Sequence, residues 1–493
     1  MRQWLWEGSV TEKAAVSRLW PELRSALTSI VGKQNCLFDP QEIAPYCEDW
    51  RQLHKGCTPA VVRPGCTEEV AAVVRLCAAR GVAIVPQGGN TSLVDGATPG
   101  GEGNEIVLLL ARMNKVRELD VVNLTLTVDA GITLQAAQEA VLAEDCLLPL
   151  SMGSEGSAQI GGVLSTNAGG NNTVRYGNAR DLVLGLEVVL PDGEIWNGLR
   201  RLRKDNTGYC LRQLFVGAEG TLGIITAAVL KLVQRPRDIA LAFCAVSSEQ
   251  AALDLFLLCR EHHHNSIQAF EYMCGAGIDL VLAHISGTRF PLAKPAGHYV
   301  LVELADYSPG AGLREKLEDV LGIAMDSGLV QDAVLAGSSA ERAGLWRLRE
   351  EQSEAQKRES ASVKNDISVP VSKVAEFLVR ARADCERRFP GIRVIPYGHI
   401  GDGNIHFNLL PASGAENSAF LQQTAAMMDS VNEAARQFDG SFSAEHGIGR
   451  VKLRMMEEWR GGAELATMRR IKTALDPLGI MNPGKVLPRD PAP

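Results

Sequence analysis

The order of apolar and polar residues divides the chain into stretches with different periods. Residues 12–31 carry Leu19, Leu23 and Leu27 in helical register and predict one helix. From residue 60 to about 235, short apolar runs alternate with glycine-rich loops, which indicates strands joined through tight turns. From about 236 to 445, longer helical patterns alternate with strands and lack these loops, which predicts a separate α+β layer.

Some predicted elements have recognisable ends. Thr67 is expected to cap a helix over residues 68–80, and Gly81 is expected to end it, because glycine reaches the left-handed backbone conformation without strain. Further strands are predicted over residues 60–64, 82–86, 184–190 and 298–304. Further helices are predicted over residues 250–262, 311–327, 339–357 and 371–389.

Composition narrows the class of protein. A chain of 493 residues is longer than one hydrophobic core usually serves, so two or more domains are expected, and the net charge of -8 argues against a nucleic-acid partner. No apolar run approaches the ~18 residues of a transmembrane segment, and the first residues lack the apolar core of a secretion signal. The eleven scattered cysteines contain no Cys-x-x-Cys pair. We therefore expect a cytoplasmic protein with reduced thiols and without an iron–sulfur cluster or a zinc ribbon.

Two glycine-rich stretches indicate a bound ligand. Residues 87–92 follow a strand and expose backbone N–H groups that can hold a phosphate, although such a loop alone is more often a simple turn. It is neither a Rossmann fingerprint nor a Walker A loop. Residues 149–172 are so rich in Gly, Ser, Thr and Asn that they would be disordered in solvent, yet apolar segments closely bound them on both sides. A large, flat, polar ligand with phosphates would hold this backbone in place.

A turn flanked by two histidines suggests a metal site. Residues 401–404 read Gly-Asp-Gly-Asn, which is turn chemistry, so that His399 and His406 lie on opposite shoulders and can point toward one place. Glu445 and His446 are adjacent in a second glycine-flanked segment. Two imidazoles and one carboxylate would form a three-ligand catalytic site with an open position. The alternative is a pair of surface histidines in a tight loop.

Two cations are candidates for binding an anion. Arg349 has no acidic residue three or four positions away on its predicted helix, which suggests a guanidinium without a local partner, although it can also reach solvent or pair with a distant carboxylate. Lys364 is less informative, because Asp366 on the same strand face can pair with it.

Several sequence strings resemble one flavoprotein family. PQGGNTS (86–92), IGGVLSTNAGG (160–170), RYGN (175–178), KDNTGY (204–209) and GAEGTLGIIT (217–226) are similar to the flavin-binding domain of the vanillyl-alcohol oxidase and p-cresol methylhydroxylase superfamily. With PYGHIGDGNIHFN (396–408), SAEHGIG (443–449) and LDPLGIMNPGK (475–485), they most closely resemble its D-2-hydroxyglutarate dehydrogenase branch. The resemblance extends from about residue 45 to residue 487.

The resemblance implies a fold and a division of the chain. The expected class is α+β, with a two-subdomain FAD-binding domain of the p-cresol methylhydroxylase type and an α+β substrate cap that contains an antiparallel sheet. The implied parts are an N-terminal helical segment joining the FAD domain (1–55), the FAD-binding domain (56–235), the cap (236–445), and a C-terminal segment that returns to the FAD domain (446–493).

The resemblance also implies a cofactor site for FAD. No histidine lies beside Gln87, so the flavin should be bound non-covalently. The residues expected to contact it are Pro86, Gly88, Gly89, Asn90, Thr91, Ser92, Gly153, Gly161, Gly162, Ser165, Thr166, Asn167, Gly169, Gly170, Arg175, Tyr176, Glu219, Gly220, Gly223, Ile225 and Asn482.

The implied activity is the FAD- and metal-dependent oxidation of D-2-hydroxyglutarate to 2-oxoglutarate, with hydride transfer to the flavin. His399, His406 and Glu445 would hold the divalent metal, expected to be zinc, and His446 would be the general base. The residues expected at the substrate are Arg349, Lys364, Asn408 and Ser353, where the family usually has Thr.

Other activities remain open at this point. D-lactate or glycolate dehydrogenases of the same superfamily are the alternative, and a metal-dependent hydrolase and a flavin-binding protein without turnover are more distant ones. The expected electron acceptor is an electron-transfer flavoprotein or a quinone-linked carrier, and a homodimer is possible.

Overall fold

The N-terminal half of the molecule, residues 10–234, contains two main sheets. The computed structural model describes residues 10–488. Helix α1 (Val10–Val31) and α3 (Thr67–Arg80) accompany a sheet of order β1-β2-β4-β3, formed by β1 (Cys36–Leu37), β2 (Val61–Val62), β3 (Ala83–Gln87) and β4 (Glu105–Leu109). Strands β2 and β3 both run parallel to β4. The predicted first helix is confirmed, and its Leu23 and Leu27 are buried.

The second sheet of the N-terminal half is antiparallel. Its order is β5-β6-β10-β8-β9, formed by β5 (Val116–Asp120), β6 (Thr125–Asp129), β8 (Val183–Val189), β9 (Ile195–Gly198) and β10 (Ile224–Lys231). Strands β7 (Cys146–Leu147) and β11 (Val233–Gln234) form a separate, antiparallel two-stranded sheet. The connecting helices are α2 (Pro40–Ile43), α4 (Leu134–Leu142), α5 (Ile160–Ser165), α6 (Thr173–Tyr176), α7 (Ala179–Leu182) and α8 (Arg212–Phe215).

The cap, residues 238–436, is built on one seven-stranded antiparallel sheet. Its order is β15-β12-β14-β13-β17-β18-β16, formed by β12 (Asp238–Val246), β13 (Ile267–Cys274), β14 (His298–Asp306), β15 (Val330–Leu335), β16 (Asp366–Ser368), β17 (Arg393–His399) and β18 (Asn404–Leu410). Helices α9 (Glu249–His263), α11 (Leu313–Asp326), α14 (Val374–Arg388) and α16 (Thr424–Arg436) share one apolar core with it. Helices α10 (Gly275–His284), α12 (Ser339–Glu350) and α13 (Gln352–Glu359) share another. The sheet is therefore covered on both faces.

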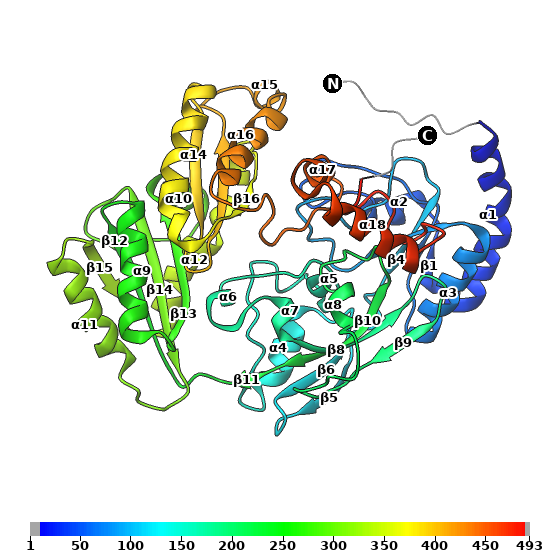
Figure 1. Cartoon of the computed structure of the whole chain (residues 1–493), viewed down its shortest axis with the longest axis horizontal. Coiled ribbons are helices and arrows are strands. Elements are labelled where there is room, and N and C mark those ends of the chain that lie inside the picture. Colours follow the sequence, from blue (N-terminus) through cyan, green and yellow to red (C-terminus); the bar gives the residue numbers. More distant parts are fainter. Residues whose placement is uncertain (1–9, 489–493) are drawn as a thin grey trace.

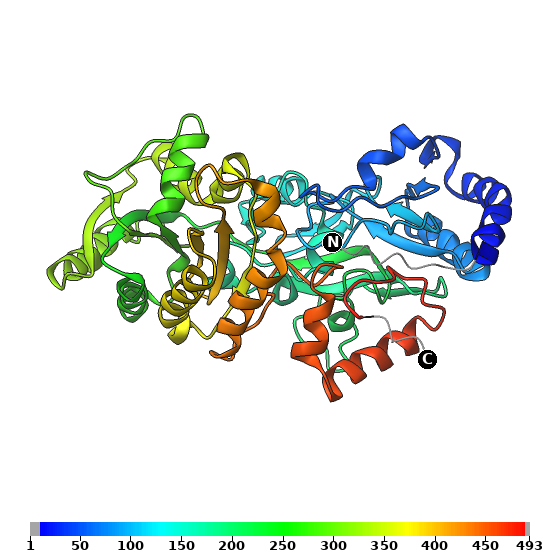
Figure 2. The ribbon, with the colours of Figure 1, turned by 90° about the horizontal axis from the view of Figure 1, so that it is seen from above.

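The C-terminal residues return to the N-terminal half. Helices α17 (Leu453–Arg460) and α18 (Ala463–Leu475) follow the cap, and then Ile480 and Asn482 exchange backbone hydrogen bonds with Ile84 of β3 at 2.8 Å each. Figures 1 and 2 show the cap on one side and the N-terminal half with α17 and α18 on the other. Within residues 10–488, no helix combines the length and apolar character needed to cross a membrane.

Two local predictions are corrected. Helix α3 starts at Thr67, so Cys66 and not Thr67 is its N-cap, and the Thr67 hydroxyl donates to Glu187 at 2.6 Å instead. The helix predicted over 339–357 is broken into α12 and α13 at Glu351. Gly81 does end α3, with φ of 63°.

Candidate active site

One large cavity separates the glycine-rich loops from the cap. It has a volume of about 710 Å³ and is lined from both sides. Most residues expected at the cofactor contribute to its wall: Pro86, Gly88, Gly89, Asn90, Thr91, Ser92, Gly153, Gly161, Gly162, Ser165, Thr166, Gly169, Glu219, Gly220, Gly223 and Ile225. From the cap and the segment after it come Arg349, Ser353, Lys364, His406, Asn408, Glu445 and His446.

The glycine wall has the properties of a cofactor cradle. A Cβ added to Gly162, in the short helix α5, would meet no atom within 4 Å, so the space beside it is open. Gln159, directly before that helix, lines the cavity, and its buried Oε1 has no hydrogen-bond partner in the described residues. A buried acceptor without a donor is costly and fits a ligand that brings one. The residues present therefore fit a large polar cofactor such as FAD.

At position 89 glycine is required because of the protein's own packing and not because of a ligand. A Cβ there would lie 1.9 Å from the carbonyl oxygen of Ser157, so the protein's own backbone excludes a side chain at this position. Gly161 is similarly restricted, because its added Cβ would lie 2.9 Å from the Cβ of Ala130. Among these three glycines, Gly162 is the one whose missing side chain leaves space for a ligand.

Five residues expected at the cofactor do not line the cavity. Arg175 donates to the carbonyl oxygen of Ala305 at 2.7 Å, and the hydroxyl of Tyr176 lies 3.2 Å from that of Tyr307, so both contact the cap. The other three residues contact the protein's own backbone. Asn167 accepts from the N–H of Arg180, and Asn482 donates to the carbonyl oxygens of Gly96 and Glu219. An added Cβ on Gly170 would lie 2.0 Å from the carbonyl oxygen of Ser151.

The predicted turn between the two histidines is present. Strands β17 and β18 form a hairpin in which His399 pairs with Asn404, and Tyr397 with His406. Gly403 has φ of 89°, and Asp402 accepts from the N–H of Asn404 at 3.0 Å. The ring centroids of His399 and His406 are 5.7 Å apart. The turn thus brings both imidazoles together, as the spacing predicts.

His399 is oriented by a carboxylate that the sequence did not reveal. Its Nδ1 donates to Glu271 of β13 at 2.7 Å, and its Nε2 faces Nη2 of Arg349 at 3.4 Å. Burial lowers the pKa of His399, but the charge of Glu271 outweighs it and raises the pKa to about 9. A carboxylate bound to one ring nitrogen is a common support for a histidine whose other nitrogen binds a metal.

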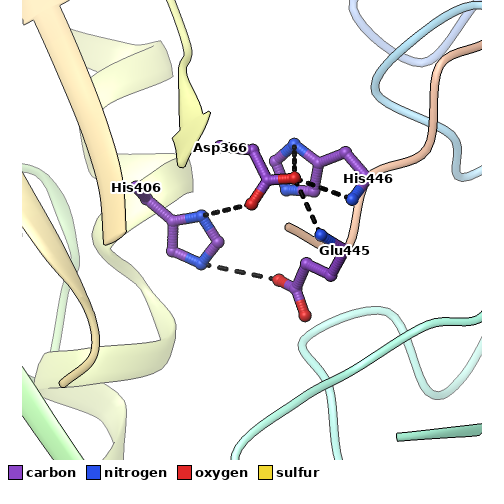
Figure 3. Close-up of side chains that lie close together, drawn as sticks. All are labelled: Asp366, His406, Glu445 and His446. Carbon is purple, nitrogen blue, oxygen red and sulfur yellow. Dashed lines mark hydrogen bonds and ion pairs between the residues drawn. The ribbon is translucent and has the colours of Figure 1, made fainter. Parts of the chain in front are cut away.

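Four residues form a compact cluster of ligand-type side chains. The ligand atoms of Asp366, His406, Glu445 and His446 all lie within 4.8 Å of one another (Figure 3). His406 Nε2 is 3.6 Å from Glu445 Oε1, and the rings of His406 and His446 stack with centroids 5.5 Å apart. His399 is adjacent to this cluster but is not part of it. Asp366 was not among the residues expected from the sequence.

Burial sets the protonation of this cluster. It raises the pKa of Glu445 to about 7 and lowers the pKa of His446 to about 4. Burial and the neighbouring His446 also hold the pKa of His406 well below its usual value. A divalent metal binds neutral imidazoles and a carboxylate, and few protons have to leave when these groups are already in that state. Of the predicted ligands, His406 and Glu445 lie in this cluster and fit such an ion. His399 lies beside the cluster with a pKa raised to about 9, so it would have to lose a proton before it could bind a metal.

Arg349 pairs with a distant carboxylate, which is one of the alternatives that the sequence left open. Its Nε donates to Glu271 at 2.6 Å, and the residue is 6% exposed. Glu271 lies 78 residues away on β13, so helical spacing could not reveal it. The same carboxylate contacts His399, which places Arg349 beside the histidine hairpin.

Lys364 lies at a different part of the cavity and does not pair with Asp366. Its ammonium donates to the hydroxyl of Ser353, and the ring of Trp50 lies 5.6 Å away. Burial, followed by the charges of Arg51 and Lys357, lowers the pKa of Lys364 to about 7. Lys364 is half-buried and makes no ion pair within residues 10–488, although the charge of Glu354 acts on it, so it is suited to an anionic ligand.

Comparisons with known proteins agree with this geometry. The family described as "FAD linked oxidases, C-terminal domain" matches residues 235–486, and "FAD binding domain" matches residues 58–198. The mitochondrial D-2-hydroxyglutarate dehydrogenase of Danio rerio is 39% identical over 91% of this chain and 82% of its own. The D-2-hydroxyglutarate dehydrogenase of Xanthomonas citri pv. viticola is 38% identical over 92% and 94%. A structure of p-cresol methylhydroxylase with substrate bound superposes with a TM-score of 0.73 at 17% identity, covering 98% of each chain.

The fold, the glycine cradle and these matches define an FAD-dependent oxidoreductase. The chain belongs to the D-2-hydroxyglutarate dehydrogenase family, and it has the fold of p-cresol methylhydroxylase. The expected family, the α+β fold class with its antiparallel cap sheet, and the cofactor FAD are confirmed.

Replacing Gly162 by Val is expected to weaken FAD retention by about 100-fold or more, because the added methyl groups occupy open cofactor space and not protein space. The measurement is the flavin content of purified enzyme, read in the supernatant after acid precipitation, which also tests whether the wild-type flavin is non-covalent. Gly322→Val in α11 is the control, because its added Cβ also meets no atom within 4 Å, and Gly322 is exposed and is not among the residues that line the cavity. Equal flavin content in both variants would contradict the assignment of Gly162.

Proposed function

We propose that this enzyme oxidises D-2-hydroxyglutarate to 2-oxoglutarate, with a divalent metal, zinc by its donor set, held by His399, His406 and Glu445. The observation that carries the proposal is one continuous cavity in which the glycine cradle, the histidine cluster and two separate cations, Arg349 and Lys364, form the walls. A dicarboxylate with a hydroxyl at one end matches this distribution of charge. The names of the relatives support the same substrate.

Bound FAD supplies the hydride acceptor, and the bound metal supplies positive charge that favours loss of the hydroxyl proton. His446 receives that proton, because an imidazole with its pKa lowered to about 4 is neutral near pH 7 and has a free basic nitrogen. Its backbone N–H donates to Asp366 at 2.8 Å, which fixes the chain at this residue. Asn408, whose Nδ2 donates to Gln356 at 2.9 Å, presents a buried Oδ1 with no hydrogen-bond partner in the described residues to a donor on the substrate.

The two cations take the two carboxylates. Arg349 lies beside His399 and holds the carboxylate next to the hydroxyl. Lys364, supported by Ser353, holds the distal carboxylate at the wall that Trp50 closes. Arg349 is not placed at the distal end, because Glu271 ties its Nε to the histidine end of the cavity.

Other parts of the function stay predictions. The electron acceptor is an external electron-transfer flavoprotein or quinone-linked carrier, because a chain without Cys-x-x-Cys spacing offers no iron–sulfur relay. The proposed location is cytoplasmic and the proposed assembly is a homodimer.

The substrate is tested by anaerobic bleaching of the flavin with a panel of D-2-hydroxy acids. D-2-hydroxyglutarate is expected to reduce the flavin with the highest kcat/KM, and D-lactate and glycolate more slowly.

Lys364→Met should lower kcat/KM for D-2-hydroxyglutarate by about 30- to 150-fold, equivalent to about 2–3 kcal/mol for a lost charged hydrogen bond, and change the D-lactate rate much less. The exposed Lys357→Met, which also removes a cation near Trp50, is the control.

The pH dependence adds a second readout for Lys364. With a folded-state pKa of about 7, the ammonium is charged below that pH and loses its charge above it, so the KM for D-2-hydroxyglutarate should rise between about pH 6 and pH 9. Lys364→Arg keeps the charge over this range and should flatten the rise. Equal losses on dicarboxylate and monocarboxylate substrates would place Lys364 outside the distal site. A wild-type preference for D-lactate or glycolate would replace the proposed substrate.

A further inference from the structure

The segment that carries Glu445 and His446 has no regular secondary structure of its own. Residues 443–449, here called the catalytic loop, lie between β18 with its following helices and α17, and contain neither helix nor strand. Gly447 and Gly449 have φ of 82° and 51°. A loop without a ladder or helix of hydrogen bonds must obtain its position from other groups, because buried backbone N–H groups need acceptors.

The cap holds the first part of the catalytic loop through one carboxylate. Oδ2 of Asp366 accepts hydrogen bonds from three consecutive backbone N–H groups, those of Ala444, Glu445 and His446, at 3.0, 2.9 and 2.8 Å. Its Oδ1 accepts from Nδ2 of Asn404 at 3.0 Å. Both oxygens of Asp366 are thus already bound, so its place in the cluster of Figure 3 is that of an anchor and not of a free metal ligand.

The N-terminal half holds the second part of the loop through another carboxylate. Glu219 accepts from the N–H of Ile448 at 2.7 Å on Oε1 and from the N–H of Gly449 at 2.9 Å on Oε2. Glu219 itself lines the cofactor cavity, and Asn482 fixes its carbonyl oxygen with a hydrogen bond of 2.7 Å. A Cβ on Gly447 would lie 2.7 Å from Oε1, so this close approach requires glycine.

We propose that Glu219 and Asp366 are positioning residues that clamp the catalytic loop from the two halves of the enzyme and set Glu445 and His446 relative to the flavin. The argument is geometric: five of the six N–H groups from Ala444 to Gly449 end on two buried carboxylates, one from each half. Burying two carboxylates is costly unless they gain strong hydrogen bonds, so the arrangement favours one loop position over its alternatives. The inference rests on the proposed roles of Glu445 and His446 and deepens them.

An isosteric variant separates positioning from general stability. In Glu219→Gln the side-chain amide NH₂ faces one of the two backbone N–H groups, so one of the two hydrogen bonds is lost and the loop shifts. We expect the rate of flavin reduction by substrate, per bound flavin, to fall by about 10- to 100-fold, and zinc affinity, measured by competition with a chromophoric chelator, to fall by about tenfold. Because Glu219 also lines the cofactor cavity, every rate is expressed per bound flavin, and photochemical reduction of the bound flavin should match the wild type.

Glu187→Gln is the matched control. Glu187 is as buried as Glu219, lies in the same half, and accepts hydrogen bonds from Thr67, Thr226 and Arg117, but it does not touch the catalytic loop. This variant should lose thermal stability while keeping the wild-type reduction rate per bound flavin and the wild-type zinc affinity. Asp366→Asn should resemble Glu219→Gln, because an NH₂ group would then face either Asn404 or the three N–H groups.

The readouts also separate this inference from the proposed substrate. Zinc affinity and the visible spectrum of the cobalt-substituted holoenzyme report the position of Glu445 without any hydroxy acid, so an altered cobalt spectrum in Glu219→Gln would support the clamp even if the substrate proved different. If Glu219→Gln does not fold, Gly447→Ala serves as a second variant with the same expected changes, because its Cβ collides with the same carboxylate. Unchanged zinc affinity, cobalt spectrum and reduction rate per flavin in the folded variant would overturn the proposal. A loss explained wholly by missing flavin would overturn it as well.

Discussion

Removal of the metal is expected to lower flavin reduction by D-2-hydroxyglutarate by at least about 10³-fold while leaving the flavin absorbance in place, because stabilising an alkoxide with a cation contributes several kcal/mol. Cofactor and ion have separate binding residues: the glycine cradle holds one, and the histidine hairpin with Glu445 is proposed to hold the other. The measurement is stopped-flow reduction of enzyme treated with a chelator, with metal content determined on the same sample.

Return of the ion provides the control for metal removal. Zinc, manganese and cobalt should restore the rate to different degrees, since they differ in preferred geometry and acidity. Photochemical reduction of the flavin should proceed normally throughout, because it does not use the histidine cluster. Full activity in enzyme shown to be metal-free would reduce His399, His406 and Glu445 to a structural role.

His446→Ala is expected to lower kcat by about 10³-fold at neutral pH, because general-base catalysis contributes about 10²- to 10⁴-fold. Its imidazole, with its pKa lowered to about 4, is neutral at this pH and is the proposed proton acceptor of the site. Metal content and flavin content should stay at the wild-type level, since the proposed ligands and the cradle are untouched. Single-turnover reduction rates together with metal analysis provide the measurement.

A second histidine gives the matched control for His446. His284 is half-buried in the cap, its Nε2 lies 2.7 Å from Oε2 of Glu359, and it is not among the residues that line the cavity. His284→Ala should leave kcat near the wild-type value. A His446→Ala enzyme that keeps metal and reduces its flavin at the wild-type rate would remove His446 as the base.

The predictions that depended on short stretches of chain agree with the structure. The Gly-Asp-Gly-Asn turn needed only its own residues to bring His399 and His406 together, because glycine and Asx residues define a turn locally. The glycine-rich loops likewise line the cavity, because glycine allows the backbone to come close to a ligand. The untested roles of these residues toward FAD, metal and substrate stay predictions.

The predictions that needed distant partners were incomplete. Arg349 has no acid within helical reach, but Glu271 on a strand of the cap sheet binds it at 2.6 Å. The break at Glu351 also separates Arg349 in α12 from Ser353 in α13, so these residues are not successive positions on one helix. Lys364 bonds with Ser353 and not with its near neighbour Asp366, whose carboxylate is used by the catalytic loop.

The amino-acid sequence by itself determined the family, the cofactor and the local turns, because glycine loops and the histidine hairpin encode their geometry within a few residues. Only the tertiary structure decided how charges are paired at the site. Glu271, Asp366 and Glu219 each reach partners 78 to 230 residues away in the chain, through contacts that exist only once the cap sheet and the N-terminal half enclose the same cavity. Buried carboxylates select partners by distance in space, and spacing along the chain carries no information about that distance.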